Sequence, residues 1–501
     1  MRRLNLPSKD ACFAFLLVIS SAILLNINLG YKTAKGIDFI FNALFFAFIL
    51  SARRMVRRLA WVLVFISAVY SITANLYGKP SILVMSSLFQ TNTTEALEFV
   101  KQVTCYQMAL PVVTMLIFFY LSKDRKIKNN TISCVFLVLM AGVIFVRFDR
   151  EMGVRLNMFN FFQRAYTSYY SYKENMADLN SSRGLPSNWK ASSVLPNGKR
   201  KNLYIVIIGE SMRSDYSSLY GYPVKNMPFL EREPGDYYSQ YHAAAPNTFM
   251  ALPRTLAKTN PDGNIEINNN IVTLAKALHM ETYWLSNQGF LGKADTPISK
   301  ISIYSDHLFL LKKGSYDDSN SDDSELITPY EKILNQKKEN TLVVFHLMGS
   351  HANFCDRLTR NDMIIPHREK AISCYLSTYL KADKMIEKIY TLAEQKQYHF
   401  KIMYFSDHGL SKDESSGHLT LLHNASYKQN YNIPLLVLDS SAKSRTYHDK
   451  PISALNFISF YATFLDARIE SPQPFHFDDN TIFNGGQYID HRTLAEDPPV
   501  I

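Results

Sequence analysis

Three strand-like runs of this chain each lead into residues that can bind a metal ion. The runs 202–209, 341–347 and 400–405 are followed by Glu210, by Gly349-Ser350-His351 and by Ser406-Asp407-His408-Gly409. Short apolar runs are typical of buried parallel strands, and open α/β sheets bind ligands outside the carboxyl ends of such strands. Carboxylate oxygens and imidazole nitrogens are ligands that zinc prefers. The pattern therefore predicts a metal-dependent hydrolase or transferase, with Glu210, Asp407 and His408 as candidate ligands.

A candidate nucleophile lies between the first of these runs and the next. Thr248 follows Pro246-Asn247, which looks like a helix start. A hydroxyl at a helix N-terminus faces free N–H groups and the positive end of the helix dipole, which favour an alkoxide and a bound phosphate. Coordination to a metal would lower the hydroxyl pKa further. Taken alone, however, this position is more typical of a helix cap than of a nucleophile.

The segments that precede this domain are predicted to be membrane helices. The first third of the 501-residue chain carries five apolar stretches: Cys12 to Leu29, Phe39 to Leu50, Leu59 to Leu76, Val103 to Leu121 and Ile132 to Phe148. Most are close to the roughly 20 residues that a helix needs to cross a bilayer, and the succession of spans argues against a cleaved signal peptide. Residues 1–150 are therefore expected to form an all-α transmembrane domain with five helices.

The positive charge of the chain predicts its orientation. The net charge is +10, and basic clusters lie at the N-terminus, at Arg53–Arg58 and at Lys123–Lys128, whereas the alternate loops are less basic. Basic loops stay in the cytoplasm, so an odd number of spans places everything after Phe148 outside. The charge therefore indicates membrane topology, and no nucleic-acid partner is expected.

Residues 151–200 are predicted to form an interfacial amphipathic helix and a linker. Phe159, Phe162, Tyr166 and Tyr169 fall at helical spacing, and such an aromatic helix can lie in the headgroup layer or pack against the catalytic domain. The segment from Leu179 to Lys201 is rich in Ser, Asn, Pro, Gly and Lys, which is typical of a linker. The catalytic domain is then expected over residues 201–501.

Other polar and sulfur-containing residues of this last domain allow further predictions. Cys355 and Cys374 lie where oxidation is permitted and could form a disulfide, although the sequence alone leaves the pairing open. The segment Asp317 to Glu325 is expected to be a solvated loop, because it lacks the spacing and glycine of an EF-hand. His346 and the Asp306-His307 pair are expected to be structural.

Several motifs of the chain resemble those of a known family and occur in the same order. They are Ile208-Gly209-Glu210-Ser211-Met212-Arg213-Ser214-Asp215, Gly221-Tyr222-Pro223, Met227-Pro228, Gly349-Ser350-His351, Ser406-Asp407-His408-Gly409 and Leu422-His423-Asn424. These motifs, the five predicted spans and the segment Gln90 to Ala96 resemble the bacterial phosphoethanolamine transferases, which include lipid A-modifying enzymes. The resemblance covers nearly the whole chain. It implies an alkaline-phosphatase/sulfatase-like α/β domain, with a mainly parallel sheet and helices on both faces.

The resemblance also implies a role for each candidate residue. One zinc ion would be held by four residues, which are Glu210, Thr248, Asp407 and His408. Thr248 would be the nucleophile, His351 and His423 would bind phosphate or a second zinc ion and transfer protons, and Lys293 would bind phosphate. The implied reaction moves phosphoethanolamine from phosphatidylethanolamine to an envelope glycan or lipopolysaccharide through a phosphorylated Thr248. We expect a monomeric, multi-pass protein of the bacterial inner membrane, with its catalytic domain in the periplasm.

Two departures from the family pattern bear on the acceptor. The run Leu410 to Glu414 lacks the glutamate that usually follows Asp-His-Gly closely, and only Cys355 and Cys374 are available for disulfides in the domain. Both departures favour lipopolysaccharide core sugars or periplasmic glucans over lipid A itself. One alternative is a phosphoglycerol transferase that uses phosphatidylglycerol, often with manganese. Another is a non-catalytic membrane sensor, against which the intact set of candidate zinc ligands argues.

Overall fold

A computed structural model describes most of the catalytic domain and parts of the segment before it. The described residues are 19–20, 23–31, 43, 54–81, 84–85, 88–89, 103–123, 157–181, 185–194, 202–288, 297–311, 321–336, 338–414 and 419–501. The chain divides into two compact units, the first comprising residues 1–85 and 95–172 and the second residues 86–94 and 173–501. Each unit is described by itself.

The first unit contains the helices α3 (Arg54–Tyr77) and α6 (Cys105–Lys123), which pack against each other. Trp61 of α3 meets Phe118 of α6 edge to face at a centroid distance of 4.8 Å. The predicted spans 59–76 and 103–121 are thus helical, whereas the spans predicted at 39–50 and 132–148 lie almost wholly outside the described residues. Within the part of the chain that the structure describes, none of the helices combines the length and apolar character needed to cross a bilayer. The prediction of five membrane helices is therefore not confirmed.

Helix α8 (Asn157–Ser181) occupies the predicted amphipathic segment and extends three residues into the predicted linker. Phe161 and Tyr172 of this helix are buried, and the ring of Phe161 lies 4.8 Å from that of Tyr70 in α3. Tyr166 and Tyr169 are exposed, whereas Phe162 packs against the same core as Phe161. The predicted stripe is therefore packed at Phe162 and exposed at Tyr166 and Tyr169.

The second unit is built on a mainly parallel sheet with the strand order β13-β3-β12-β9-β2-β8-β6-β7. The strands are β2 (Asn202–Gly209), β3 (Gly235–His242), β6 (Glu281–Ser286), β7 (His307–Leu310), β8 (Asn340–His346), β9 (His399–Ser406), β12 (Asn432–Asp439) and β13 (Arg445–His448), with β14 (Ile452–Ser453) beside β3. Within this sheet only β12 runs antiparallel to its two neighbours. The central strands β2, β8 and β9 are buried on both faces, which explains their continuous apolar runs.

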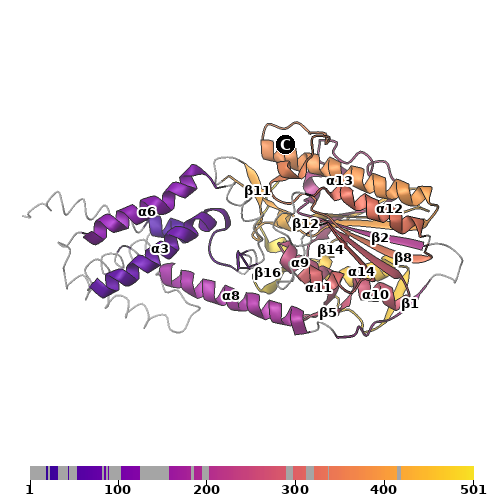
Figure 1. Cartoon of the computed structure of the whole chain (residues 1–501), viewed down its shortest axis with the longest axis horizontal. Helices are drawn as coiled ribbons and strands as arrows, with labels where there is room; N and C mark the ends of the chain where they lie inside the picture. Colours follow the sequence, from indigo (N-terminus) through magenta and orange to yellow (C-terminus); the bar gives the residue numbers. More distant parts are fainter. Residues whose placement is uncertain are drawn as a thin grey trace, which may run out of the picture. The chain divides into compact units, whose positions relative to one another are not determined.

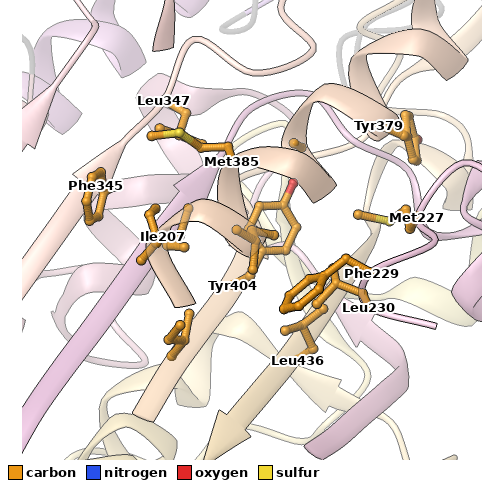
Figure 2. Packing of buried hydrophobic residues seen from close by; sticks show 14 of the residues in the cluster. Ile207, Met227, Phe229, Leu230, Phe345, Leu347, Tyr379, Met385, Tyr404 and Leu436 are labelled. Carbon is orange, nitrogen blue, oxygen red and sulfur yellow. The ribbon is translucent and has the colours of Figure 1, made fainter. Parts of the chain in front are cut away.

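Helices cover both faces of this sheet, as the sequence resemblance implied (Figure 1). One face carries α12 (Ile327–Asn335) and α13 (Lys370–Gln395), and the other carries α9 (Thr248–Leu256), α10 (Ile271–Ala277), α11 (Pro297–Ser302) and α14 (Phe457–Phe464). Alternate residues of β2 point to the two faces, so Ile207 joins the first core and Val206 the second. Figure 2 shows Ile207, Phe345 and Tyr404 of the strands packed near Tyr379 and Met385 of α13.

Short elements attach the remaining segments to the sheet. Two-stranded ribbons are formed by β1 (Lys190–Ser193) with β15 (Ala467–Ser471), β4 (Ala257–Thr259) with β5 (Ile265–Asn270), β10 (Ser411–Asp413) with β11 (Thr420–Leu422), and β16 (Thr481–Asn484) with β17 (Gln487–Asp490). The predicted linker therefore contains a strand that pairs with β15. Cys355 and Cys374 form a disulfide between the turn after β8 and the first turns of α13.

Candidate metal centre and nucleophile

Strand register brings the candidate ligands to one edge of the sheet. Gly209 of β2 lies opposite Ser406 of β9, so the next residues, Glu210 and Asp407, leave the sheet side by side. The turn after β8 closes against them at Gly349, whose φ of +48° suits glycine and where a Cβ atom would lie 2.9 Å from the backbone nitrogen of Glu210. The sequence prediction that three strands end together at this edge is confirmed.

Glu210, Asp407 and His408 form a buried cluster of potential metal ligands. Their ligand atoms all lie within 4.8 Å of one another. His408 Nε2 is 3.2 Å from Glu210 Oε1 and 3.3 Å from Asp407 Oδ2. His408 Nδ1 lies 2.8 Å from the carbonyl oxygen of Gly409, which makes Nδ1 the natural proton carrier and leaves Nε2 facing the carboxylates.

The hydrogen bonding of this cluster fits a divalent cation. Asp407 Oδ1 accepts from the backbone N–H groups of Ser211 and His408, at 3.0 and 2.8 Å. Among the described residues, the buried Oδ2 of Asp407 has no hydrogen-bond donor. A buried carboxylate oxygen without a donor is costly, and a cation between Oδ2, Glu210 and His408 would remove that cost. Two carboxylates and one imidazole form a donor set suited to zinc.

The directions of the pKa shifts in the cluster favour one positive charge beside the two carboxylates. Burial, and then the neighbouring Glu210, raise the pKa of Asp407 to about 7. Burial opposes protonation of His408, but Asp407 and Glu210 outweigh it and raise the pKa of His408 to about 9. Burial also opposes ionisation of Glu210, yet the hydrogen bond and charge of His408 hold its pKa below the ordinary value. Without a cation, a proton on His408 balances the carboxylates, and a divalent ion would replace it.

The Thr248 hydroxyl lies within this cluster. Its Oγ1 is 3.1 Å from Glu210 Oε2 and 3.2 Å from His408 Nε2. The cap of α9 is the preceding residue, because Asn247 has extended backbone angles and its side chain accepts from the N–H of Met250 at 3.1 Å. Thr248 is thus the first helical residue and not the cap, which leaves its hydroxyl free to face the cluster.

The two predicted histidines lie beside the cluster, whereas the predicted lysine is outside the described residues. The ring of His423 is 4.5 Å from that of His408, and its Nδ1 lies 3.2 Å from the carbonyl oxygen of Pro246. Burial, and then His408, lower the pKa of His423 to about 3, so this ring is neutral. His351 is close enough to lower the pKa of Glu210 and of His423 by its charge. The role predicted for Lys293 stays a prediction.

Neutral residues that the sequence analysis did not single out hold the Glu210 carboxylate. Ser211 Oγ donates to Oε1 at 2.7 Å, and Gln288 Nε2 donates to Oε2 at 3.0 Å. Ser211 lies within one of the motifs that resemble the family, but serines and glutamines occur on every surface and carry no local signal of such a role.

Asp323 also holds the site, although its segment was expected to be a solvated loop. Residues 312–320 of that region lie outside the described residues, but Asp323 accepts from the backbone N–H groups of Met348 and Gly349 at 2.8 and 2.9 Å. It thereby fixes the turn that packs on Glu210. The prediction missed this because the partners lie 25 residues or more away in sequence.

A second cluster of buried charge stabilises the turn that follows Glu210. The Arg213 guanidinium forms ion pairs with Asp215 at 2.7 Å and with Asp497 at 2.9 Å. The backbone N–H of Arg213 lies 3.0 Å from the hydroxyls of Tyr375 and Tyr379. These contacts join the turn to α13 and to the C-terminal segment.

The residues expected to be structural lie away from the ligand cluster or inside the strands. Asp306 pairs with Lys276, and His307 lies 2.7 Å from Glu281, at the start of β7. His346 is buried in β8, where its Nδ1 lies 3.3 Å from the hydroxyl of Ser286, and burial lowers its pKa to about 4.

Comparison of the sequence with known proteins shows which family the chain belongs to. Residues 202–467 match the sulfatase family model. The chain is 29% identical over 464 residues to the phosphoethanolamine transferase OpgE of Escherichia coli K12, covering 88% of this chain and 86% of that protein. It is 30% identical over 368 residues to a putative phosphoethanolamine transferase of Haemophilus influenzae, covering 70% of this chain and 72% of that protein.

Solved structures share the fold. The integral membrane lipooligosaccharide phosphoethanolamine transferase A (EptA) of Neisseria meningitidis matches with a TM-score of 0.64 and 16% identity, over 91% of this chain and 96% of that one. The periplasmic domain of EptC from Escherichia coli, solved in complex with zinc, matches with a TM-score of 0.53 and 19% identity, over 62% of this chain and 98% of that one. The ligand cluster and helix α9, which carries Thr248, lie inside the matched sulfatase region. The chain belongs to the sulfatase family and, within it, to the phosphoethanolamine transferase enzymes.

Proposed function

We propose that this enzyme transfers phosphoethanolamine from phosphatidylethanolamine to a hydroxyl or phosphate group of an envelope glycan or lipopolysaccharide, through a covalent intermediate on Thr248. The observation that carries the proposal is the position of the Thr248 hydroxyl, within 3.2 Å of both Glu210 and His408 at the start of α9. A hydroxyl placed among carboxylate and imidazole acceptors is suited to nucleophilic catalysis.

The proposed reaction has two displacements at phosphorus. In the first, Thr248 Oγ1 bonds to the donor phosphorus while the bond to the diacylglycerol oxygen breaks, and that oxygen leaves with a proton. The Thr248 proton has an acceptor in Glu210 Oε2 at 3.1 Å. In the second, an oxygen of the acceptor bonds to phosphorus and loses its proton, while the bond to Thr248 breaks and the hydroxyl is restored.

The residues present fit zinc as the cofactor. Glu210, Asp407 and His408 would hold the ion, and it would supply Lewis-acid stabilisation of charge on the transferred group. The periplasmic domain of EptC was solved in complex with zinc, which supports the same choice of metal for this chain. We assign His351 and His423 to binding of the phosphoryl group and to proton transfer, and Lys293 to phosphate binding.

We further propose that the enzyme is a multi-pass protein of the bacterial inner membrane with its catalytic domain in the periplasm. A lipid donor requires a site close to a bilayer. Several large apolar side chains of α3 and α6 are exposed, among them Val62, Phe65, Val69, Val112, Leu116 and Phe119. The disulfide between Cys355 and Cys374 supports an oxidising compartment for the catalytic domain.

The proposal is tested by trapping the intermediate. Purified full-length enzyme is incubated with phosphatidylethanolamine labelled in its headgroup, quenched in acid and digested, and the peptide containing Thr248 is analysed by mass spectrometry. We expect phosphoethanolamine on Thr248 in the wild type and none in Thr248→Val, which keeps the side-chain shape. Label on another residue, or turnover by Thr248→Val at more than a few per cent of the wild-type rate, would reject the nucleophile. Label from phosphatidylglycerol alone would instead favour a phosphoglycerol transferase.

A further inference from the structure

Gln288 reaches the metal centre from a neighbouring strand. It lies two residues beyond the end of β6, whose last residue, Ser286, is opposite His346 of β8. Its Nε2 donates to Glu210 Oε2 at 3.0 Å and to the carbonyl oxygen of Leu347 at 2.9 Å. We propose that Gln288 is a positioning residue for the metal centre, which holds the Glu210 carboxylate in one orientation. The inference rests on the proposed function.

The two oxygens of Glu210 have different partners. Oε1 accepts from Ser211 Oγ at 2.7 Å and lies 3.2 Å from His408 Nε2, so it faces the ligand cluster. Oε2 accepts from Gln288 and is the nearer of the two oxygens to Thr248 Oγ1, at 3.1 Å against 3.4 Å for Oε1, so it faces the proposed nucleophile. The terminal torsion of a glutamate is broad and roughly two-fold, so the carboxylate has no intrinsic preference between these orientations. The Gln288 amide supplies that preference for Oε2.

Gln288 is itself held on both sides. Its backbone N–H donates to Ser286 Oγ at 3.1 Å. The adjacent Asn287 donates to Asp323 Oδ1 at 2.8 Å, and Asp323 also holds the N–H groups of Met348 and Gly349. The amide therefore approaches Glu210 from a fixed turn and loses little conformational entropy on donating, which is what positioning requires.

A neutral donor suits this place better than a charged one. A lysine beside Glu210 would neutralise the carboxylate and would repel a cation in the cluster. An amide fixes the orientation of Glu210 and leaves its negative charge available. Mutation of a residue that hydrogen-bonds to a metal ligand typically changes metal affinity by about 10–100-fold.

The test is zinc affinity, measured without turnover. Full-length wild type and Gln288→Leu are purified in detergent, stripped of metal, and titrated with zinc against a chelator of known affinity, well below the melting temperature of either protein. We expect Gln288→Leu to bind zinc about 10–100-fold more weakly than the wild type. Gln288→Asn, which keeps the amide but is one methylene shorter, gives a second measurement in a less disruptive variant and is expected to bind zinc more weakly too.

The matched control is Asn456→Leu. Asn456 Nδ2 also donates to one carbonyl oxygen and one carboxylate, those of Phe477 at 3.0 Å and Asp479 at 2.9 Å, but this carboxylate is not part of the ligand cluster. We expect Asn456→Leu to lose stability and keep the wild-type zinc affinity. Equal losses of affinity in both variants, or no loss in the Gln288 variants, would overturn the inference alone. A wild type that binds no divalent cation would overturn the proposed metal centre as well.

Discussion

Two clusters of buried charge lie on either side of the turn at Ser211 and Met212, and their hydrogen bonding differs. In the Arg213 cluster, the guanidinium is matched by Asp215, by Asp497 and by the carbonyl oxygen of Asp497. In the Glu210 cluster, the acceptors outnumber the donors, and Asp407 Oδ2 has no donor among the described residues. A satisfied ion-pair network serves stability, whereas a cluster short of positive charge is built to receive it from outside. The comparison separates a structural cluster from a functional one within a few residues of sequence.

Substitution of Asp407 is expected to give the largest loss of activity without a loss of stability. Asp407→Asn keeps the shape of the side chain but removes the negative charge that the cation needs. We expect transfer activity to fall by about 10³-fold or more, equivalent to several kcal/mol of transition-state stabilisation. Stability of the metal-free protein should not fall, because the amide relieves the repulsion between Asp407 and Glu210. Activity assays and thermal unfolding in chelator check both parts, and a metal-free variant that unfolds well below the metal-free wild type would contradict the comparison.

The opposite result is expected for Asp497. Asp497→Ala leaves the buried Arg213 guanidinium with only one of its two carboxylate partners, Asp215, and also removes the acceptor for the N–H of Lys412. We expect a loss of about 3 kcal/mol in the free energy of unfolding, with activity per folded molecule largely retained. Chemical denaturation followed by an activity assay normalised to folded protein makes the measurement. The matched surface control is Asp490→Ala, which removes the exposed pair with Arg492 and the hydrogen bond from the backbone N–H of Arg492, and should cost about 1 kcal/mol.

Removal of the metal should affect stability through the Glu210 cluster. Binding to the folded state alone stabilises by RT ln(1 + [L]/Kd), about 2.7 kcal/mol at a free zinc concentration one hundred times Kd. The melting temperature of the wild type should therefore rise with free zinc, and that of Asp407→Asn should rise far less. Equal zinc responses in the two proteins would place the metal elsewhere in the molecule.

The smallest effect is expected at Ser211, which links the two clusters. Ser211 has a positive φ of 58°, a conformation that favours glycine, and its hydroxyl donates to Glu210 Oε1. Ser211→Gly relieves the backbone strain and loses the hydrogen bond, two effects of about 1 kcal/mol with opposite sign. We expect an unfolding free energy within about 1 kcal/mol of the wild type and a weaker zinc affinity. Unchanged zinc affinity in this variant would show that the hydrogen bond from Ser211 to Glu210 Oε1 does not contribute to zinc binding.

The sequence alone was sufficient to predict the sheet and the residues at its edge. Apolar runs buried on both faces indicate parallel strands, and parallel strands of similar register end together, so Glu210, Asp407 and His408 could be grouped before any coordinates. The resemblance to the family then assigned roles to Thr248, His351 and His423, and these roles stay predictions. The grouping of Glu210, Asp407 and His408 agrees with the structure because it rests on local patterns of five to ten residues and on a rule of topology that holds for all such sheets.

Only the tertiary structure decided which neutral groups complete the site. Asn247 and not Thr248 caps α9, Gln288 and Ser211 divide the oxygens of Glu210 between them, and Asp323 lies in contact with the turn after β8. Arg213 pairs with Asp497 across 284 residues of sequence. The periodicity of the sequence does not predict such partners, because each hydrogen bond depends on how the packing of the core brings two distant segments together. The same side chain elsewhere on the surface would donate to water.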